Sequence, residues 1–132
     1  MYVLDSNAFT RLLNNASPAL VQRLCRCDPS HIHLSSVVKA ELLYGARHSA
    51  RVFENLQLLE RFSAPFISLP FDDQCAEYYG LIRTDLAAQL IGPNDLLIAA
   101  SAPAFDLTLL THNTVEFTRI VGLRVEDWEG DL

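Results

Sequence analysis

No apolar run in this sequence of 132 residues approaches the roughly 18 to 20 residues that a membrane-spanning helix requires. The N-terminus also lacks the basic-then-apolar order of a signal peptide, because Asp5 interrupts its first apolar run. There is no repeat, no low-complexity stretch and no linker rich in Gly, Ser or Pro. We therefore expect one compact domain over residues 1–132, located in the cytoplasm and without membrane contact.

Cysteine is scarce, and the three cysteines are an odd number, which fits a reducing compartment. Cys25-Arg26-Cys27 and His31-Ile32-His33 carry side chains that bind zinc. Both spacings are tighter than those of the usual structural zinc sites, so we do not predict a zinc site there.

Positive charge is also limited, because the net charge is −6 and nine of the ten basic residues are arginine. This balance argues against a large nucleic-acid surface, since phosphate contacts come from Lys and Arg. A small local patch could still bind RNA, and a basic protein partner fits an acidic chain. Arginine suits bidentate contacts with phosphate, although the bias could equally reflect a GC-rich genome. The candidates for phosphate contacts are Arg11, Arg47, Arg83 and Arg119.

The sequence has no P-loop, no Gly-rich dinucleotide fingerprint and no Ser/His/Asp signature. Short apolar segments alternate with longer segments of helical periodicity, which is typical of an α/β fold with a parallel central sheet between helices. We predict strands at 2–4, 32–34, 66–69, 107–110 and 123–125. We predict helices after Asp5, from Pro18, from Ser35 or Ser36 to about Gly45, and at 50–62, 72–90, 93–100 and 114–120.

Polar residues follow two of these strands directly. Asp5 ends the strand at 2–4, and Thr111-His112-Asn113 ends the strand at 107–110. Open α/β sheets bind ligands at the carboxyl edge where the strand order reverses. If the order reverses between these two strands, Asp5 and Asn113 flank that crevice, with His112 beside it.

Two further carboxylates lie on predicted helices. Glu41 is about one and a half turns into its helix, on or beside a face that we expect to be buried. It therefore needs a cation or a hydrogen-bond partner there. Asp95 lies in the first turn of the helix that begins at Pro93.

Each of the four residues also has a role open to it that needs no ligand. Asp5 could cap the first helix, and Asp95 could favour the helix dipole. Glu41 could pair with a basic residue of its own helix on a solvated face. Asn113 could be a turn residue. Singly none is compelling, and only their joint context indicates a site.

Four segments of the chain resemble, in order and at familiar separations, the motifs of the PIN-domain ribonucleases, specifically the VapC toxins of bacterial toxin–antitoxin pairs. They are Tyr2-Val3-Leu4-Asp5-Ser6-Asn7, the segment from Ser36 to Ala46 around Glu41, the segment from Ile91 to Ala100 around Asp95, and the tail from Leu110 to Trp128. The resemblance covers nearly the whole chain. It implies a PIN-like α/β/α sandwich and an acidic pocket that binds Mg²⁺ or Mn²⁺.

The resemblance assigns the catalytic set to Asp5, Glu41, Asp95 and Asn113. It implies that Asp5 and Asp95 bind the metal directly and that Glu41 acts through water or orients the attacking water. Asn113 would be a neutral ligand or a substrate contact, and Asn7 would orient Asp5. Oxygen ligands of this kind suit hard cations such as Mg²⁺.

The same resemblance implies an endoribonuclease toxin that hydrolyses phosphodiester bonds in RNA, with tRNA among the possible targets. Its partner would be a cognate VapB-like antitoxin that inserts a basic residue near the acidic pocket. We expect a homodimer, with a larger toxin–antitoxin hetero-oligomer as an extension of it.

The chain departs from the family pattern in the short segment before Ile91, at Ser6, at Ser101, at Pro103, which should end or kink its helix, and at Asp106, a turn position often held by Gly. Two alternatives therefore stay open. One is a catalytically weak PIN-fold module that mainly binds an antitoxin. The other is a phosphohydrolase or receiver-like domain in which Asp5 accepts phosphate.

Overall fold

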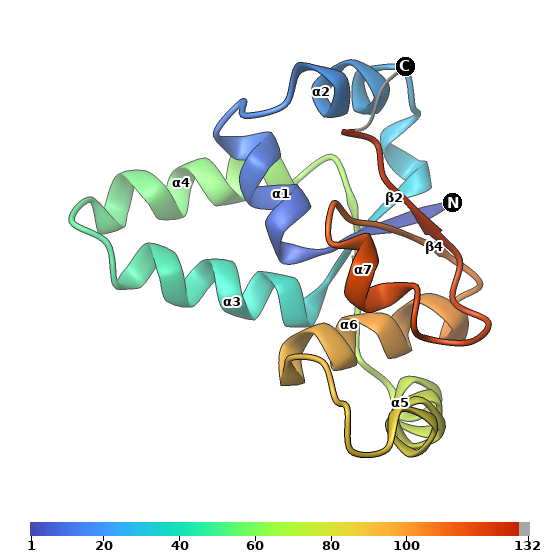
Figure 1. Ribbon diagram of the computed structural model, residues 1–132. Coiled ribbons are helices and arrows are strands. Elements are labelled where there is room, and N and C mark those ends of the chain that lie inside the picture. The colour runs from blue at the N-terminus through green and yellow to red at the C-terminus, as the bar shows by residue number, and fades with distance from the viewer. Residues whose placement is uncertain (130–132) are drawn as a thin grey trace.

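The computed structural model describes residues 1–129, in which five parallel strands form one sheet flanked by helices (Figure 1). The strands are β1 (Tyr2–Leu4), β2 (Ile32–Ser35), β3 (Ile67–Leu69), β4 (Thr108–Leu110) and β5 (Val125–Glu126). The α-helices are α1 (Ser6–Leu13), α2 (Pro18–Cys25), α3 (Ser36–Arg47), α4 (Val52–Ser63), α5 (Asp73–Leu86), α6 (Pro93–Ala104) and α7 (Thr114–Phe117). This architecture confirms the predicted α/β/α sandwich with a parallel sheet.

The helices begin where side-chain caps are available. Asp5 caps α1 by accepting a hydrogen bond from the backbone N–H of Ala8 at 2.7 Å. Ser17 caps α2, with Pro18 in its first turn, and Ser35 rather than Ser36 caps α3. A side-chain oxygen at this position satisfies an N–H that has no partner within the helix. The local sequence therefore fixes these three starts.

Helix ends differ from the predicted ones. α5 stops at Leu86 instead of reaching residue 90, because Ala87 adopts a φ of 53° that no helix continues. Asp106, at the expected Gly-like turn, likewise has a φ of 56°. α6 includes Pro103 and ends one residue later, at Ala104, so the helical hydrogen bond that proline cannot donate is lost only in its last turn. α7 ends three residues early at Phe117, and β5 begins two residues later than predicted.

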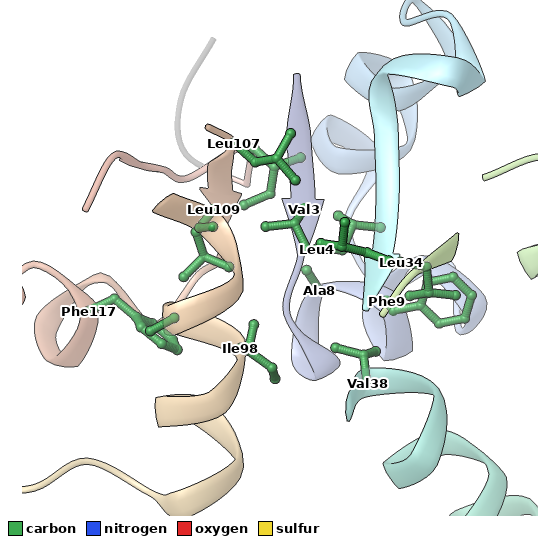
Figure 2. Close-up of a cluster of buried hydrophobic side chains, with 14 of the residues drawn as sticks. Val3, Leu4, Ala8, Phe9, Leu34, Val38, Ile98, Leu107, Leu109 and Phe117 are labelled. Atoms are coloured by element: carbon green, nitrogen blue, oxygen red, sulfur yellow. The ribbon is translucent and has the colours of Figure 1, made fainter. Parts of the chain in front are cut away.

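Apolar side chains from the sheet and from the surrounding helices meet in one buried cluster. Figure 2 shows Val3 and Leu4 of β1 between side chains of neighbouring elements, among them Phe9 of α1 and Ile98 of α6. α6 is apolar on most of its surface, as expected for a helix enclosed by its neighbours. Such enclosure leaves its first turn, with Asp95, at the edge of the core.

Helix pairs surround the sheet. In Figure 1, α3 and α4 run side by side away from the strands, while α5 and α6 pack together on the side of the molecule opposite α2. Within residues 1–129, no helix has both the length and the apolar composition that crossing a membrane would require.

Candidate active site

The sheet reverses its order at β1. The strand order is β3-β2-β1-β4-β5, so the chain builds outward on one side of β1 and then returns to its other side with β4. Leu4 pairs with Leu110, and the backbone N–H of Asp5 donates to the Leu110 carbonyl at 3.2 Å. The predicted reversal between these two strands is therefore confirmed, and the residues that follow both strands are adjacent.

Asp5 is held firmly at this edge, with only 2% of its surface exposed. Its Oδ1 accepts from the Ala8 N–H, and its Oδ2 accepts from the Thr111 hydroxyl at 2.5 Å. Burial raises the pKa of the Asp5 carboxyl, the two hydrogen bonds oppose this rise, and the charges of Glu129 and Glu41 add to it. Asp5 is both the helix cap and a carboxylate in an acidic environment.

Glu41 reaches the same region from α3. It is half-buried, and its Oε1 accepts a hydrogen bond from the Ser6 hydroxyl at 2.6 Å. This hydroxyl provides the partner that a carboxylate on this face requires. The alternative was an ion pair of Glu41 with Lys39 or Arg47. Neither is among the ion pairs described within residues 1–129, and Lys39 donates instead to Ser68 at 2.8 Å.

Asp95 is a carboxyl whose pKa is raised well above its ordinary value. Partial burial, followed by the charges of Asp5, Glu41 and Glu116, raises its pKa from 3.8 to about 6. Carboxylates brought together in a partly dry site repel one another, so one of them keeps its proton to a higher pH. The contributions of Asp5, Glu41 and Glu116 to this rise place carboxylates far apart in the sequence near one another, in what we call the acidic pocket.

Asn113 and Glu116 complete this pocket. Asn113 donates from its side-chain amide to Glu116 Oε2 at 3.2 Å, and its backbone N–H donates to the Thr111 hydroxyl at 2.9 Å. The predicted site did not include Glu116. The spacing between Asn113 and Glu116 could have indicated it, because residues three apart on a helix lie on one face.

The predicted orienting contact from Asn7 to Asp5 is absent from the hydrogen bonds described within residues 1–129. The hydrogen bonds described for the Asp5 carboxylate come from Ala8 and Thr111, whereas the Asn7 side chain is exposed. Asn7, Ser6 and Glu41 instead line one groove of ≈ 450 Å³ between α1, α3 and α4. This groove gives solvent, substrate or a partner chain access to Glu41.

The donor set suits a hard divalent cation such as Mg²⁺ or Mn²⁺. Its charged donors are all carboxylate oxygens, and a cation would relieve both the burial of their charge and the repulsion between them, the two causes of the raised pKa of Asp95. The ligand atoms of Asp5, Glu41 and Asp95 do not themselves lie within 4.8 Å of one another, since within residues 1–129 this close grouping occurs only for His112, Asp127 and Glu129. An ion would therefore have to draw the three carboxylates closer or bind some of them through water.

Three of the four arginines proposed for phosphate contacts are engaged within the chain. Arg11 pairs with Glu129, Arg83 donates to the Tyr79 hydroxyl, and Arg119 donates to the Gln89 carbonyl in the short segment before α6. The last contact ties the loop that presents Asp95 to the segment after α7. Arg47 lines a separate groove of ≈ 580 Å³ between α3 and α4.

The raised pKa of Asp95 predicts how the stability of the metal-free protein depends on pH. Between 3.8 and about 6, the folded state binds more protons at Asp95 than the unfolded state does. The contribution of Asp95 to the free energy of unfolding should therefore fall as pH rises through this window and then level off. Melting temperatures measured in a chelator between pH 4 and 7 should show a smaller fall in Asp95→Asn than in the wild type. An equal fall in melting temperature in the two proteins would contradict the raised pKa of Asp95.

Comparison with known proteins gives consistent matches over almost the full length. The family model described as PIN domain matches residues 2–123. The chain is 37% identical over 129 residues to the tRNA(fMet)-specific endonuclease VapC of Shigella flexneri, covering 96% of this chain and 97% of that protein.

Solved structures agree with this match. The structure of DNA-bound VapBC from Salmonella typhimurium superposes with a TM-score of 0.91 at 35% identity, covering 96% of this chain and 97% of the other. VapBC2 from Rickettsia felis, bound to a DNA fragment from its promoter, gives a TM-score of 0.89 at 36% identity, covering 96% and 98%.

Proposed function

Because this chain belongs to the PIN domain family, as a VapC ribonuclease toxin of the toxin–antitoxin type, we propose that it cleaves RNA by metal-dependent phosphodiester hydrolysis in the acidic pocket. The observation that carries this proposal is that Asp95 is partly buried beside Asp5, Glu41 and Glu116, so that burial first and the three charges second raise its pKa to about 6. Carboxylates clustered at a sheet edge suit a cation, through which a phosphodiester would bind, better than they suit a purely structural role.

In this proposal Asp5 and Asp95 hold the divalent ion, Mg²⁺ or Mn²⁺. When bound, such an ion polarises a phosphodiester and lowers the pKa of a coordinated water. Asp5 is suited to holding it because Ala8 and Thr111 fix both carboxylate oxygens, which retain further lone pairs. A fixed carboxylate loses little side-chain entropy when it binds a ligand.

Glu41 and Asn113 have the supporting roles. Ser6 occupies one oxygen of Glu41 and fixes the side chain, so that the other oxygen orients a water for attack on phosphorus. Asn113 donates its amide N–H to Glu116, so its amide oxygen would be available to the ion or to a substrate hydroxyl. Glu116 then acts by positioning Asn113 and by adding negative charge to the pocket.

The substrate class that we propose is tRNA, supported by the 37% identity to a VapC named for tRNA(fMet). The partner is a VapB-like antitoxin, supported by the VapBC complexes among the similar structures. An inserted arginine of the antitoxin would find the negative charge and the carboxylate oxygens that a guanidinium binds best. The groove between α1, α3 and α4 would lead it to Glu41.

The proposal also covers the extent of the domain, its location in the cell and its assembly with other chains. We take residues 1–132 as one PIN domain, supported by a family match over residues 2–123 and by a sheet that joins β1 to β5. A cytoplasmic location fits the three free thiols. A homodimer, extended by antitoxin into a hetero-oligomer, fits the exposed apolar side chains of Leu81, Val115 and Val121.

The direct test is RNA cleavage by purified, antitoxin-free protein. Total tRNA should be cut in the presence of Mg²⁺, cleavage should stop in EDTA, and excess Mg²⁺ should restore it, because the carboxylates alone supply no polarised water. The co-encoded antitoxin, added to the Mg²⁺ arm, should also stop cleavage. Equal cleavage with and without chelator would overturn the metal-dependent mechanism. Tight antitoxin binding without any cleavage would favour the alternative of a PIN-fold binding module.

A further inference from the structure

Three potential metal ligands meet beside the acidic pocket, at the carboxyl ends of β4 and β5. His112 lies two residues after β4, and Asp127 directly follows β5, so the pairing of Leu110 with Glu126 brings them together. With Glu129 they place one ligand atom each within 4.8 Å of one another. None of the three belongs to the set proposed for RNA cleavage.

These side chains are already ordered by contacts within the chain. His112 Nδ1 lies 3.0 Å from Asp127 Oδ2, and Asp127 Oδ1 accepts from the Glu129 backbone N–H at 2.9 Å. Arg11 donates through Nε to Glu129 Oε1 at 2.5 Å. Two atoms that bind one metal at about 2.1 Å are themselves roughly 3 to 4 Å apart, so the His112–Asp127 spacing suits shared coordination.

The second oxygen of Glu129 lacks a partner among the described residues 1–129. The Glu129 side chain is only 6% exposed, and its Oε2 is buried with no hydrogen-bond partner among residues 1–129. A buried carboxylate oxygen without a partner is costly, because it has given up water and gained nothing. A bound cation at the cluster would supply that missing partner.

We propose that His112, Asp127 and Glu129 form a second cation site, selective for a divalent transition-metal ion such as Zn²⁺. One imidazole and two carboxylates are a ligand set that zinc accepts with a fourth position left open. Mg²⁺ is disfavoured there, because it prefers oxygen ligands and near-ideal octahedral geometry. Arg11 then serves as the outer hydrogen-bond partner that ligating carboxylates commonly have. The ion ties the segment after β5 to the end of β4.

Metal binding itself tests this site, so the result does not depend on whether RNA is cleaved. Metal-free full-length protein is titrated with Co²⁺, a spectroscopic substitute for Zn²⁺, and followed by visible absorption and calorimetry. In excess Mg²⁺, which competes for the acidic pocket, one equivalent of Co²⁺ should remain bound, and Zn²⁺ should release it. His112→Ala should weaken the binding of this Co²⁺ ion by about 100-fold or more, since even the loss of a group that hydrogen-bonds to a metal ligand costs 10- to 100-fold in affinity.

Two control variants separate this site from the acidic pocket and from adventitious binding at a surface histidine. Asp95→Asn alters the acidic pocket and should leave the equivalent that resists Mg²⁺ unchanged. His48→Ala removes an exposed histidine stacked on Tyr44 and should also leave it unchanged. Asp127→Asn, close in shape to the native residue, should weaken binding as His112→Ala does. The proposal fails if no Co²⁺ binds, if excess Mg²⁺ displaces all of it, or if His112→Ala binds as tightly as the wild type.

Discussion

Replacing Asp5 with asparagine is expected to lower the rate of RNA cleavage by about 100-fold or more while leaving the fold intact. Asparagine removes the negative charge that the metal requires, and loss of a direct ligand should cost at least as much as loss of an outer-shell group. Its side-chain oxygen still caps α1 through the Ala8 N–H. The Thr111 hydroxyl can rotate to accept from the new amide.

Burial raises the pKa of the Asp5 carboxyl, so a neutral side chain at this position loses no favourable charge in the metal-free protein. The melting temperature of Asp5→Asn in a chelator should therefore equal or exceed that of the wild type. Single-turnover cleavage of tRNA and thermal unfolding, measured on the same samples, separate catalysis from folding. Asp73→Asn, an identical change at an exposed position in α5, is the matched control. Wild-type cleavage by Asp5→Asn would remove Asp5 from the mechanism.

Replacing Phe9 with alanine should destabilise the protein by about 3 to 5 kcal/mol, the usual cost of removing a buried aromatic ring. Phe9 is fully buried between α1 and the sheet, and its ring packs edge-on against Phe66 with centroids 6.2 Å apart. Domains of this kind have only about 5 to 15 kcal/mol of stability, so this loss is a large fraction of it. The melting temperature should fall by on the order of 10 to 20 °C.

Urea denaturation measures this change as a lower midpoint at a similar slope. The matched control is Phe53→Ala on α4, where the same atoms are removed from a ring that is 72% exposed. Its effect should stay within about 0.5 kcal/mol. Equal losses in the two variants would mean that the core does not centre on Phe9.

The sequence predicted the elements well wherever a local signal existed. Apolar runs located β1 and β2, while Ser17 with Pro18 and the serine before α3 located two helix starts. The end of α5 was missed because Ala87 takes a left-handed conformation that its residue type does not announce. Such a conformation is imposed by the turn that must connect α5 to α6, which is not a local property.

The acidic residues were also recognisable from the sequence, because three of them lie in motifs that the chain shares with a known family. Glu116 was missed although it lies one helical turn from Asn113. Glu129 carried no signal at all, since its partner Arg11 is 118 positions away in the sequence. Contacts over such separations arise from packing, and periodicity reports only which face of an element is apolar.

The sequence by itself determined the order of strands and helices and the identity of three of the carboxylates, Asp5, Glu41 and Asp95, because apolar periodicity, caps and motifs are local properties. The tertiary structure alone decided which of those carboxylates meet. Placing β4 beside β1 brings Thr111 to Asp5 across 106 positions and couples Asp95 to the same pocket. The same arrangement sets His112 against Asp127 and, within residues 1–129, leaves one buried oxygen of Glu129 without a partner, because strand pairing and burial are properties of the whole fold.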